Sequence, residues 1–529
     1  MTQLERVAVG LCAVLAIGLV WWATAVWGPG LSPDAIAYTA IAERMRDHGQ
    51  IGYWLEPQMS SWPPLFPFLL AAVATVTGSS VVDAGRLLNA VVAGAIVVVV
   101  AALAWRLLRS RWLRGLAVAM AVLGQPLVVV EVKVWSEPSF VLFVLLTLLV
   151  LSGARGRRPV VRLLGAAALA AAAFCTRYAG LALLPAGMAA LAVWPRARPW
   201  RERAVTAAGF GVPAGLAAGA LLLWNRWRTG QVFGPRWQPH EPFWHHAADG
   251  LGAIGQWVLP SGASRGATLA FGVLVLVAAV VAVAPIRWAR AGSSTGSTES
   301  TESAASIESG DHAAESGSSE SSDVVGLAPV LASFVLCYFA YMVYARTTSG
   351  FDPLSSRLML PIFVPSMLLI LLLIDRVASV VDSEAARVAA LAVPLLLVLP
   401  GMFRGLDGLR ESRDVGTQYT SAAVRAFVAT PVLAEVPDDC EVLTNDPWLL
   451  WLAGFEAQLT PESDREVAIP VSMRLDELAP KVAAGDVCLV WMDTGSTVFY
   501  TPEQLSAVVS LHRVAGDDFT TIYRLAPAG

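Results

Sequence analysis

Residues 7–27 read VAVGLCAVLAIGLVWWATAVW and carry no charged side chain. A helix needs about 20 such residues to cross the hydrocarbon core of a bilayer. The small residues at 23–25 have the pattern of a signal-peptidase site, but this apolar run is longer than that of an ordinary signal peptide and many apolar runs follow. We therefore expect 7–27 to be a retained first membrane-spanning helix.

The whole chain has the composition of a membrane protein. Of its 529 residues, 56% are hydrophobic and only 15% are charged, whereas soluble globular chains carry about 25% charged residues. This deficit excludes an ordinary cytosolic enzyme and a disordered protein. The 37 Lys and Arg are outnumbered by 41 Asp and Glu and form no dominant basic tract, so we expect no nucleic-acid partner.

Apolar runs recur as far as residue 401, and we expect a polytopic α-helical membrane protein with about eleven transmembrane helices, because backbone groups in lipid must be satisfied within each segment. The pair at 160–194 is short enough to be a broken or re-entrant helix. Residues 65–77 are short for a span and follow two prolines, which predicts a juxtamembrane helix at the interface. Besides 7–27, the expected spans are 83–105, 115–131, 138–152, 160–175, 180–194, 203–224, 267–285, 324–344, 358–375 and 386–401.

Basic loops predict the orientation. With this map, arginine clusters within 106–114, 155–162, 196–203 and 287–290 all fall on the side of the N-terminus. The positive-inside rule makes that side cytoplasmic. Counting 65–77 as a full span would move the first cluster outside. An odd number of spans then leaves the C-terminus extracytoplasmic.

We expect two domains. Residues 1–401 form the transmembrane domain, in which 28–82 is a long first extracytoplasmic loop with juxtamembrane helices. Residues 291–323 contain Ser, Gly, Thr and Glu but no Lys or Arg, which is typical of a disordered cytoplasmic linker. Residues 402–529 have ordinary polarity and predict a small extracytoplasmic α/β domain. Its expected strands are 441–444 and 487–491, and its expected helices are 418–429 and 502–511.

Five cysteines do not make a disulfide scaffold. Cys12, Cys175 and Cys337 lie in apolar spans, where we expect them to pack. Cys440 and Cys488 lie beside two predicted strands of the outer domain. An oxidising exterior permits a bond between them, but its formation depends on the distance between their Cα atoms.

The first outer loop contains LSPDAIAYTA at 31–40. Ser32 is a natural helix N-cap, and Pro33 suits the first helical position. Asp34 then lies in the first turn, on the same face as Tyr38. One interpretation is that Asp34 only complements the helix dipole. The other is a carboxylate just outside the bilayer that takes a proton from a substrate hydroxyl, which contributes about 10²–10⁴-fold to a transfer reaction.

The loop after the third expected span reads VEVKVWSEP at 130–138 and holds Glu131, Lys133 and Glu137. Ionisable groups at the ends of apolar helices are costly and usually face a cavity or a partner. Either a Glu–Lys pair anchors the helix end, or one of these groups contacts a polar headgroup of a substrate.

Three arginines run against the positive-inside bias, because Arg177, Arg236 and Arg357 all fall on the expected outer side. They either snorkel to lipid headgroups or bind a phosphate, whose oxygens match the guanidinium fork. His48, His240, His245 and His246 are too scattered to predict a metal site. The chain has no P-loop and no other ATPase signature.

Several elements spread over 30 to about 365 occur in the order found in one family. An outer-loop Asp is followed four residues later by Tyr (Asp34, Tyr38). WPPLFP at 62–67 stands where the family commonly has His-Pro-Pro-Leu-Tyr-Pro. The other matches are WSEP at 135–138, TRYAG at 176–180, Asn225 with Thr229-Gly230, and RLMLP at 357–361. In these elements and in its topology the chain resembles the GT-C superfamily of glycosyltransferases, near the protein O-mannosyltransferases and aminoarabinose lipid A transferases (glycosyltransferase family 39-like).

The resemblance implies transfer of a sugar from a polyprenyl-phosphate carrier on the extracytoplasmic side. It implies that Asp34 is the catalytic base and that a second acidic position falls on Glu131 or Glu137, between which the motif does not decide. Trp62 replaces the family's usual His, which puts a role at that position in doubt. The candidate substrate-binding residues, some of which would hold the lipid phosphate, are Tyr38, Lys133, Arg177, Tyr178, Arg236 and Arg357.

The implied reaction is one attack of an acceptor hydroxyl on the anomeric carbon. The acceptor stays open among protein, glycan and lipid. No cofactor is predicted, and a divalent metal stays open because enzymes of this superfamily differ in using one. The main alternative is a transporter or flippase for a lipid-linked or amphipathic solute, which explains the spans and buried charges equally well. A third is a silent scaffold whose outer domain binds a partner.

Overall fold

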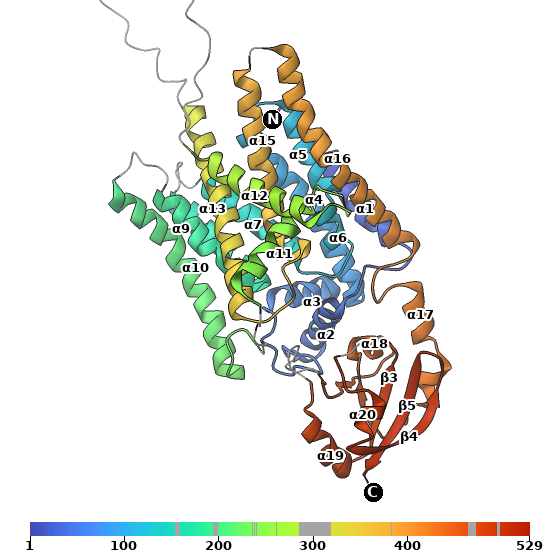
Figure 1. The fold of residues 1–529 in the computed structure, drawn as a ribbon. Coiled ribbons are helices and arrows are strands. Elements are labelled where there is room, and N and C mark those ends of the chain that lie inside the picture. The colour runs from blue at the N-terminus through green and yellow to red at the C-terminus, as the bar shows by residue number, and fades with distance from the viewer. Residues whose placement is uncertain are drawn as a thin grey trace, which may run out of the picture.

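A bundle of apolar helices and a small mixed sheet form the two parts of the molecule (Figure 1). The computed structural model describes residues 1–528 except 154–158, 194–198, 235, 237–238, 240, 261, 285–318, 382, 464–471 and 495–497. The N-terminus lies at the end of the bundle opposite to the sheet domain. Helices α2 (Pro33–His48) and α3 (Leu65–Thr77) lie between the rest of the bundle and the sheet domain.

Among the described residues, eight helical segments are long and apolar enough to cross a membrane, and they confirm a polytopic helical membrane protein. These segments are α1 (Gln3–Ala23), α4 (Val81–Leu107), α5 and α6 (Arg111–Leu123 and Gln125–Glu131), α8 (Pro159–Thr176), α10 (Trp200–Thr229), α13 (Ser319–Thr348), α14 to α15 (Ser356–Met359, η2 Leu360–Ile362, Phe363–Val380) and α16 (Glu384–Asp414). The remaining expected spans hold shorter apolar helices, namely α7 (Glu137–Ser152), η1 with α9 (Tyr178–Ala182 and Leu183–Val193) and α12 (Arg265–Val281).

Small residues allow the bundle helices to pack closely, as is usual where lipid removes the hydrophobic drive for association. A side chain at Gly94 of α4 would lie 2.8 Å from Ile17 of α1, and one at Gly405 of α16 would collide with the Leu123 carbonyl oxygen of α5. Substitution at either position would push two helices apart. The apolar core of the bundle therefore depends on its small residues as much as on its large ones.

Several expected helices are interrupted. Gly124 separates α5 from α6, and Arg177 has extended backbone angles of −148° and 135° between α8 and η1. The helix over 65–77 is confirmed as α3, which ends at Gly78 with a positive φ of 67°. A further helix, α11 (Phe243–Gly255), was not predicted because its histidines and glycines interrupt the apolar pattern.

The C-terminal domain is α/β, as predicted. Its five strands are arranged in the order β2-β1-β3-β5-β4, in which β2, β1 and β3 are parallel and β5 and β4 are antiparallel to their neighbours. The strands are β1 (Glu441–Thr444), β2 (Gln458–Leu459), β3 (Val487–Met492), β4 (Val509–Gly516) and β5 (Thr520–Pro527). The helices are α17 (Ala422–Val428), η3 (Pro431–Glu435), α18 (Pro447–Leu452), α19 (Leu475–Ala484) and α20 (Pro502–Leu505).

Some predicted boundaries differ from the structure. The helix expected at 502–511 ends at Leu505, because β4 begins at Val509 and pairs with β5. The domain boundary expected at 402 falls inside α16, which continues to Asp414. Most of the predicted linker lies outside the described residues, and its last five residues, 319–323, begin α13.

Cys440 and Cys488 form a disulfide with a Cα–Cα distance of 5.5 Å. The parallel pairing of β1 with β3 brings the two cysteines together, because Cys440 directly precedes β1 and Cys488 is the second residue of β3. Cys12, Cys175 and Cys337 are free and half-buried in the bundle. The disulfide therefore ties the start of β1 to its parallel neighbour β3.

Candidate active site

A cavity of about 480 Å³ opens where the bundle meets the C-terminal domain. Its walls come from the first outer loop, from the break at Arg177, from α13 and α14, and from α18 of the C-terminal domain. The charged residues that line it are Asp34, Glu56, Arg177, Arg236, Asp352 and Arg357. Segments more than 300 residues apart in the sequence therefore contribute charges to one hollow.

Local backbone pairing holds the helix that carries Asp34. Gly30 donates to the Val132 carbonyl at 2.8 Å and accepts from the Val134 amide at 3.0 Å. A side chain at Gly30 would collide with Lys133, so only glycine allows this approach. Two residues on, Ser32 caps α2 as predicted, accepting a hydrogen bond of 3.2 Å from the Ala35 amide.

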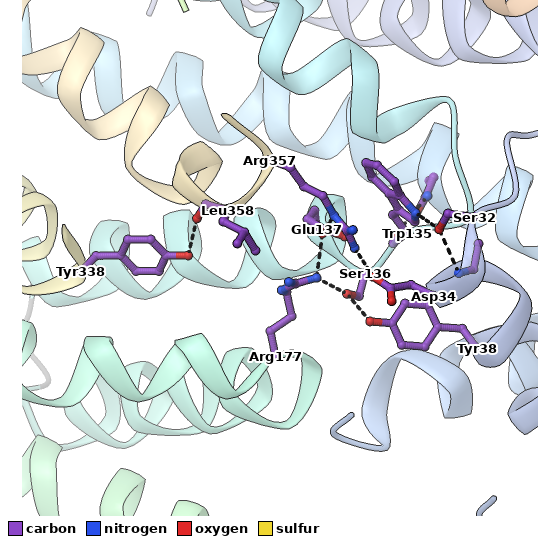
Figure 2. Close-up of polar contacts among 12 residues, drawn as sticks. Ser32, Asp34, Tyr38, Trp135, Ser136, Glu137, Arg177, Tyr338, Arg357 and Leu358 are labelled. Carbon is purple, nitrogen blue, oxygen red and sulfur yellow. Dashed lines mark hydrogen bonds and ion pairs between the residues drawn. The ribbon is translucent and has the colours of Figure 1, made fainter. Parts of the chain in front are cut away.

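Arg357 lies between two carboxylates (Figure 2). Its Nη2 donates to Asp34 Oδ2 at 2.5 Å, and its Nε donates to Glu137 Oε1. Its guanidinium also lies 3.9 Å from the centre of the Trp135 ring, and the face of an aromatic ring attracts a cation at this distance. The indole Nε1 of Trp135 donates to Ser32 Oγ at 2.6 Å. The cap of α2 and the position of Arg357 are therefore coupled through one tryptophan.

Glu137 joins a second guanidinium to this group. Arg177 Nη1 lies 2.7 Å from Glu137 Oε1 and donates to Ser136 Oγ at 3.0 Å. The Ser136 hydroxyl is 3.3 Å from the Tyr38 hydroxyl, and Figure 2 shows these side chains converging. Glu137 is only 1% exposed. This buried carboxylate thus contacts two arginines, and Asp34 supplies the second negative charge that balances them.

Two pKa values report the electrostatics of this group. Burial acts to lower the pKa of Arg177, but the nearby Glu137 and Tyr38 outweigh it, so that the pKa is raised. Burial, followed by the negative charge of Asp34, raises the pKa of Tyr38. The phenol therefore stays neutral and able to donate a hydrogen bond near pH 7. We call Asp34, Glu137, Arg177 and Arg357 the four-charge cluster.

Arg236 and Tyr178 lie on another wall of the cavity and hold one loop segment in place. Arg236 Nη2 donates to the Ser61 carbonyl at 3.1 Å, and the Tyr178 hydroxyl donates to the Ser60 carbonyl at 2.7 Å. Tyr178 also accepts a hydrogen bond of 2.8 Å from Asn225. Among the described residues, Arg236 has no carboxylate partner within ion-pair distance. Its charge is therefore available to an anion in the cavity.

Glu56 belongs to the same wall and was missed by the sequence reasoning. Its Oε1 accepts hydrogen bonds from the Ser60 and Ser61 amides at 2.6 and 3.1 Å. The residue is 8% exposed, and its Oε2 has no hydrogen-bond partner within the described part of the chain. No motif marks it, because its contacts arise from how the loop folds back on itself.

Three of the predicted site residues do not line the cavity, namely Glu131, Lys133 and Glu137, although Glu137 contacts two arginines that do. Lys133 lies 4.2 Å from the centre of the Trp135 ring, on a half-buried segment whose backbone pairs with Gly30. Burial, and next the charge of Arg357, lowers the pKa of Lys133 to about 8. Glu131 is 3% exposed, and its Oε1 has no partner among the described residues. Of the two acidic residues left open by the sequence, only Glu137 belongs to the four-charge cluster.

Within the described ranges, no group of three or more His, Cys, Asp or Glu side chains is placed to hold a metal ion. His245 lies 3.7 Å from Glu241 and 3.5 Å from Asp249 on the surface of α11. His240 lies outside the described residues.

Comparisons with known proteins bear on the fold of the chain. Residues 61–223 match the family model described as dolichyl-phosphate-mannose-protein mannosyltransferase. The apo structure of ArnT from Cupriavidus metallidurans matches with a TM-score of 0.60 at 14% identity, covering 99% of this chain and 98% of that one. The structure of ArnT bound to undecaprenyl phosphate matches with a TM-score of 0.56 at the same identity and coverage.

A more distant structure is also similar. The archaeal oligosaccharyltransferase AglB from Archaeoglobus fulgidus, in complex with an inhibitory peptide and a dolichol-phosphate, matches with a TM-score of 0.50 at 9% identity, covering 93% of this chain and 70% of that one. A search of curated proteins found no match to this chain. The fold expected from the sequence is confirmed by these structures, and the family model supports the predicted class of enzyme.

Proposed function

We propose that this chain, a membrane glycosyltransferase with the GT-C fold, moves a sugar from a polyprenyl-phosphate carrier to an acceptor hydroxyl, with Asp34 as general base. One observation carries the proposal: Asp34 lines the same cavity as Arg177, Arg236 and Arg357. A base and several cations around one hollow suit a reaction in which a hydroxyl loses a proton and a phosphate leaves.

The reaction is a single displacement at the anomeric carbon. A bond forms between the acceptor oxygen and that carbon as the bond from carbon to phosphate oxygen breaks. The acceptor proton passes to the Asp34 carboxylate, and the electron pair of the broken bond leaves with the polyprenyl phosphate. Among the described residues, Asp34 Oδ1 makes no hydrogen bond, whereas Oδ2 accepts from Arg357. Arg357 thus orients the base and leaves one oxygen for the incoming hydroxyl.

The guanidiniums stabilise the leaving phosphate. Arg177 and Arg357 are already paired with Glu137 and Asp34, whereas Arg236 makes no ion pair among the described residues, so its guanidinium is the one free to pair with the phosphate. Planar guanidinium forks match phosphate oxygens in pairs. The solved structures of ArnT with undecaprenyl phosphate and of AglB with a dolichol-phosphate support a lipid-phosphate carrier as the donor.

The proposed orientation places the cavity outside the cytoplasm and the N-terminus inside. The arginine-rich loops at 106–114 and 196–203 follow the positive-inside rule in this orientation. The N-terminus lies at the opposite end of the bundle from the C-terminal domain, which is then extracytoplasmic (Figure 1). Activated nucleotide sugars are absent there, so the activating group has to travel with the lipid. The comparisons do not favour a transporter or flippase.

Sugar transfer by the purified protein tests this function. The protein is reconstituted in liposomes with a panel of polyprenyl-phosphate sugars and with protein, glycan and glycolipid acceptors. We expect one donor to yield a glycosylated acceptor and free polyprenyl phosphate in equal amounts. Folded protein that transfers no sugar from any donor, but moves a lipid-linked solute across the bilayer, would instead support the transporter.

Replacing Arg236 by Gln should weaken donor binding. Charge-assisted hydrogen bonds contribute about 1.5–3 kcal/mol, so the KM for the polyprenyl-phosphate sugar should rise at least tenfold. Arg236→Lys keeps the charge but not the fork and should recover part of the loss. Arg265→Gln, which removes an exposed arginine outside the cavity, is the matched control. An unchanged donor KM in Arg236→Gln would remove Arg236 from the phosphate site.

A further inference from the structure

The C-terminal domain reaches the cavity through the short helix α18. Trp451 of α18 stacks on Trp54 of the first outer loop, with ring centres 5.9 Å apart and planes 5° from parallel. Trp54 Nε1 also donates to the Ala457 carbonyl at 3.0 Å. Trp448 lies three residues before Trp451, so both side chains share one face of α18. Docking of Trp451 therefore turns Trp448 toward the bundle, where it lines the cavity.

A series of ring contacts links the helix of the proposed base to α18. Tyr38 lies 5.7 Å from Trp62, Trp62 lies 6.0 Å from Tyr53, and Tyr53 lies 5.1 Å from Trp54, measured between ring centres. Trp54 then stacks on Trp451. Because buried aromatic rings pack with defined geometry, the position of α18 is tied to that of α2.

Polar contacts fix α18 independently of the rings. Asp446 caps the helix by accepting from the Leu449 amide at 3.0 Å, and the Tyr419 hydroxyl donates to both Asp446 oxygens at 3.0 and 3.1 Å. The Tyr419 amide in turn donates to the Leu31 carbonyl at 3.0 Å, one residue before the cap of α2. The helix of the base and the helix of Trp448 thus meet at one tyrosine.

Trp448 has an unused hydrogen-bond donor. Its Nε1 is buried, and it has no partner among the described residues. A buried indole N–H normally finds an acceptor. The side chain also lines the cavity, as do those of Tyr53 and Trp62. An aromatic side chain next to a free hydrogen-bond donor suits a sugar ring, whose C–H groups pack on the aromatic ring while its hydroxyl oxygens accept hydrogen bonds.

We propose that the acceptor is a saccharide and that Trp448 positions its ring, with the indole face against the sugar and Nε1 donating to one of its oxygens. This inference rests on the proposed glycosyl transfer and names the class of its acceptor. The lipid of the donor enters from the bundle, where the arginines lie. Trp448 comes from α18 of the C-terminal domain, which Figure 1 shows beyond α2 and α3 from the rest of the bundle, so we assign it to the acceptor rather than to the phosphate.

Kinetics on full-length protein in liposomes test this assignment. Trp448→Ala should raise the KM for the acceptor about tenfold, because an aromatic contact and a hydrogen bond are both lost, while the donor KM stays as in the wild type. Trp448→Phe keeps a ring and loses the donor, so it should give an intermediate acceptor KM. Trp491→Phe, in β3 and away from the cavity, is the matched control for a tryptophan change in this domain.

A binding measurement separates positioning from folding. An acceptor whose reacting hydroxyl is replaced by hydrogen should inhibit the wild type competitively, and its Ki should rise about tenfold in Trp448→Ala. Transfer by wild type with an unchanged acceptor KM in Trp448→Ala, or transfer only to polypeptide, would overturn this inference and leave the proposed function standing. The absence of transfer from every donor would overturn the proposed function itself.

Discussion

Asp34→Asn should reduce turnover about 10²–10⁴-fold, the usual contribution of a positioned general base. The amide has the size of the carboxylate, so it can still accept a hydrogen bond from Arg357, but it cannot take the acceptor proton. The donor KM should change little, because the guanidiniums that hold the phosphate stay in place. Steady-state transfer in liposomes measures the kcat, and donor titration measures the KM.

Asp47→Asn is the matched control, because Asp47 lies at the other end of the same helix, exposed and paired with Arg46. It should transfer sugar at the wild-type rate. Turnover of Asp34→Asn at the wild-type rate would exclude Asp34 as the base. A scaffold protein would be indifferent to either change, and a transporter would still move its solute unless Asp34 couples ions.

Glu137→Gln should destabilise the bundle and abolish most of the transfer. Glu137 is 1% exposed and contacts both Arg177 and Arg357. Removing its charge leaves Arg177 without a carboxylate partner among the described residues and leaves Arg357 paired with Asp34 alone. Breaking a buried ion pair in this way costs about 3–5 kcal/mol of stability. Thermal unfolding in nanodiscs should show a clear fall in the midpoint temperature of the Glu137→Gln protein. The control Asp83→Asn, at the exposed start of α4, should leave the midpoint temperature unchanged.

A double variant separates the charge effect from the catalytic one. Combining Glu137→Gln with Arg177→Met removes one positive charge together with the negative one, so the midpoint should partly recover. Transfer should stay low, because Arg357 loses the partner that holds its Nε. A Glu137→Gln protein as stable as the wild type would show that the four-charge cluster does not hold the helices together.

The local signals of the sequence predicted the elements well. The apolar run of 7–27 and its successors contain enough residues to cross a bilayer, and lipid leaves the backbone few structures besides the helix. Ser32 and Pro33 begin α2 where their side chains favour a helix start. Asp34 could be selected as a candidate because its neighbours in the sequence are enough to place it in the first turn of an outer helix.

The choice between Glu131 and Glu137 could not be made from the sequence. The two residues are six apart, and each is an acidic residue beside an apolar helix. Glu131 ends α6 and is buried with no ion pair among the described residues, whereas Glu137 begins α7 and contacts Arg177 and Arg357. The difference depends on the turn between α6 and α7, which pairs with Gly30 from a distant part of the chain.

The sequence by itself determined which segments form apolar helices, where α2 begins and which ionisable residues lie at helix ends, because each of these follows from neighbours within a few turns. Only the tertiary structure decided that Arg357 contacts Asp34 across more than 300 residues, that Glu56 faces the cavity, and that Trp448 completes its wall. Contacts of this kind form where breaks between helices and the docking of a second domain bring distant parts of the backbone together. Local sequence propensity does not determine which distant parts meet.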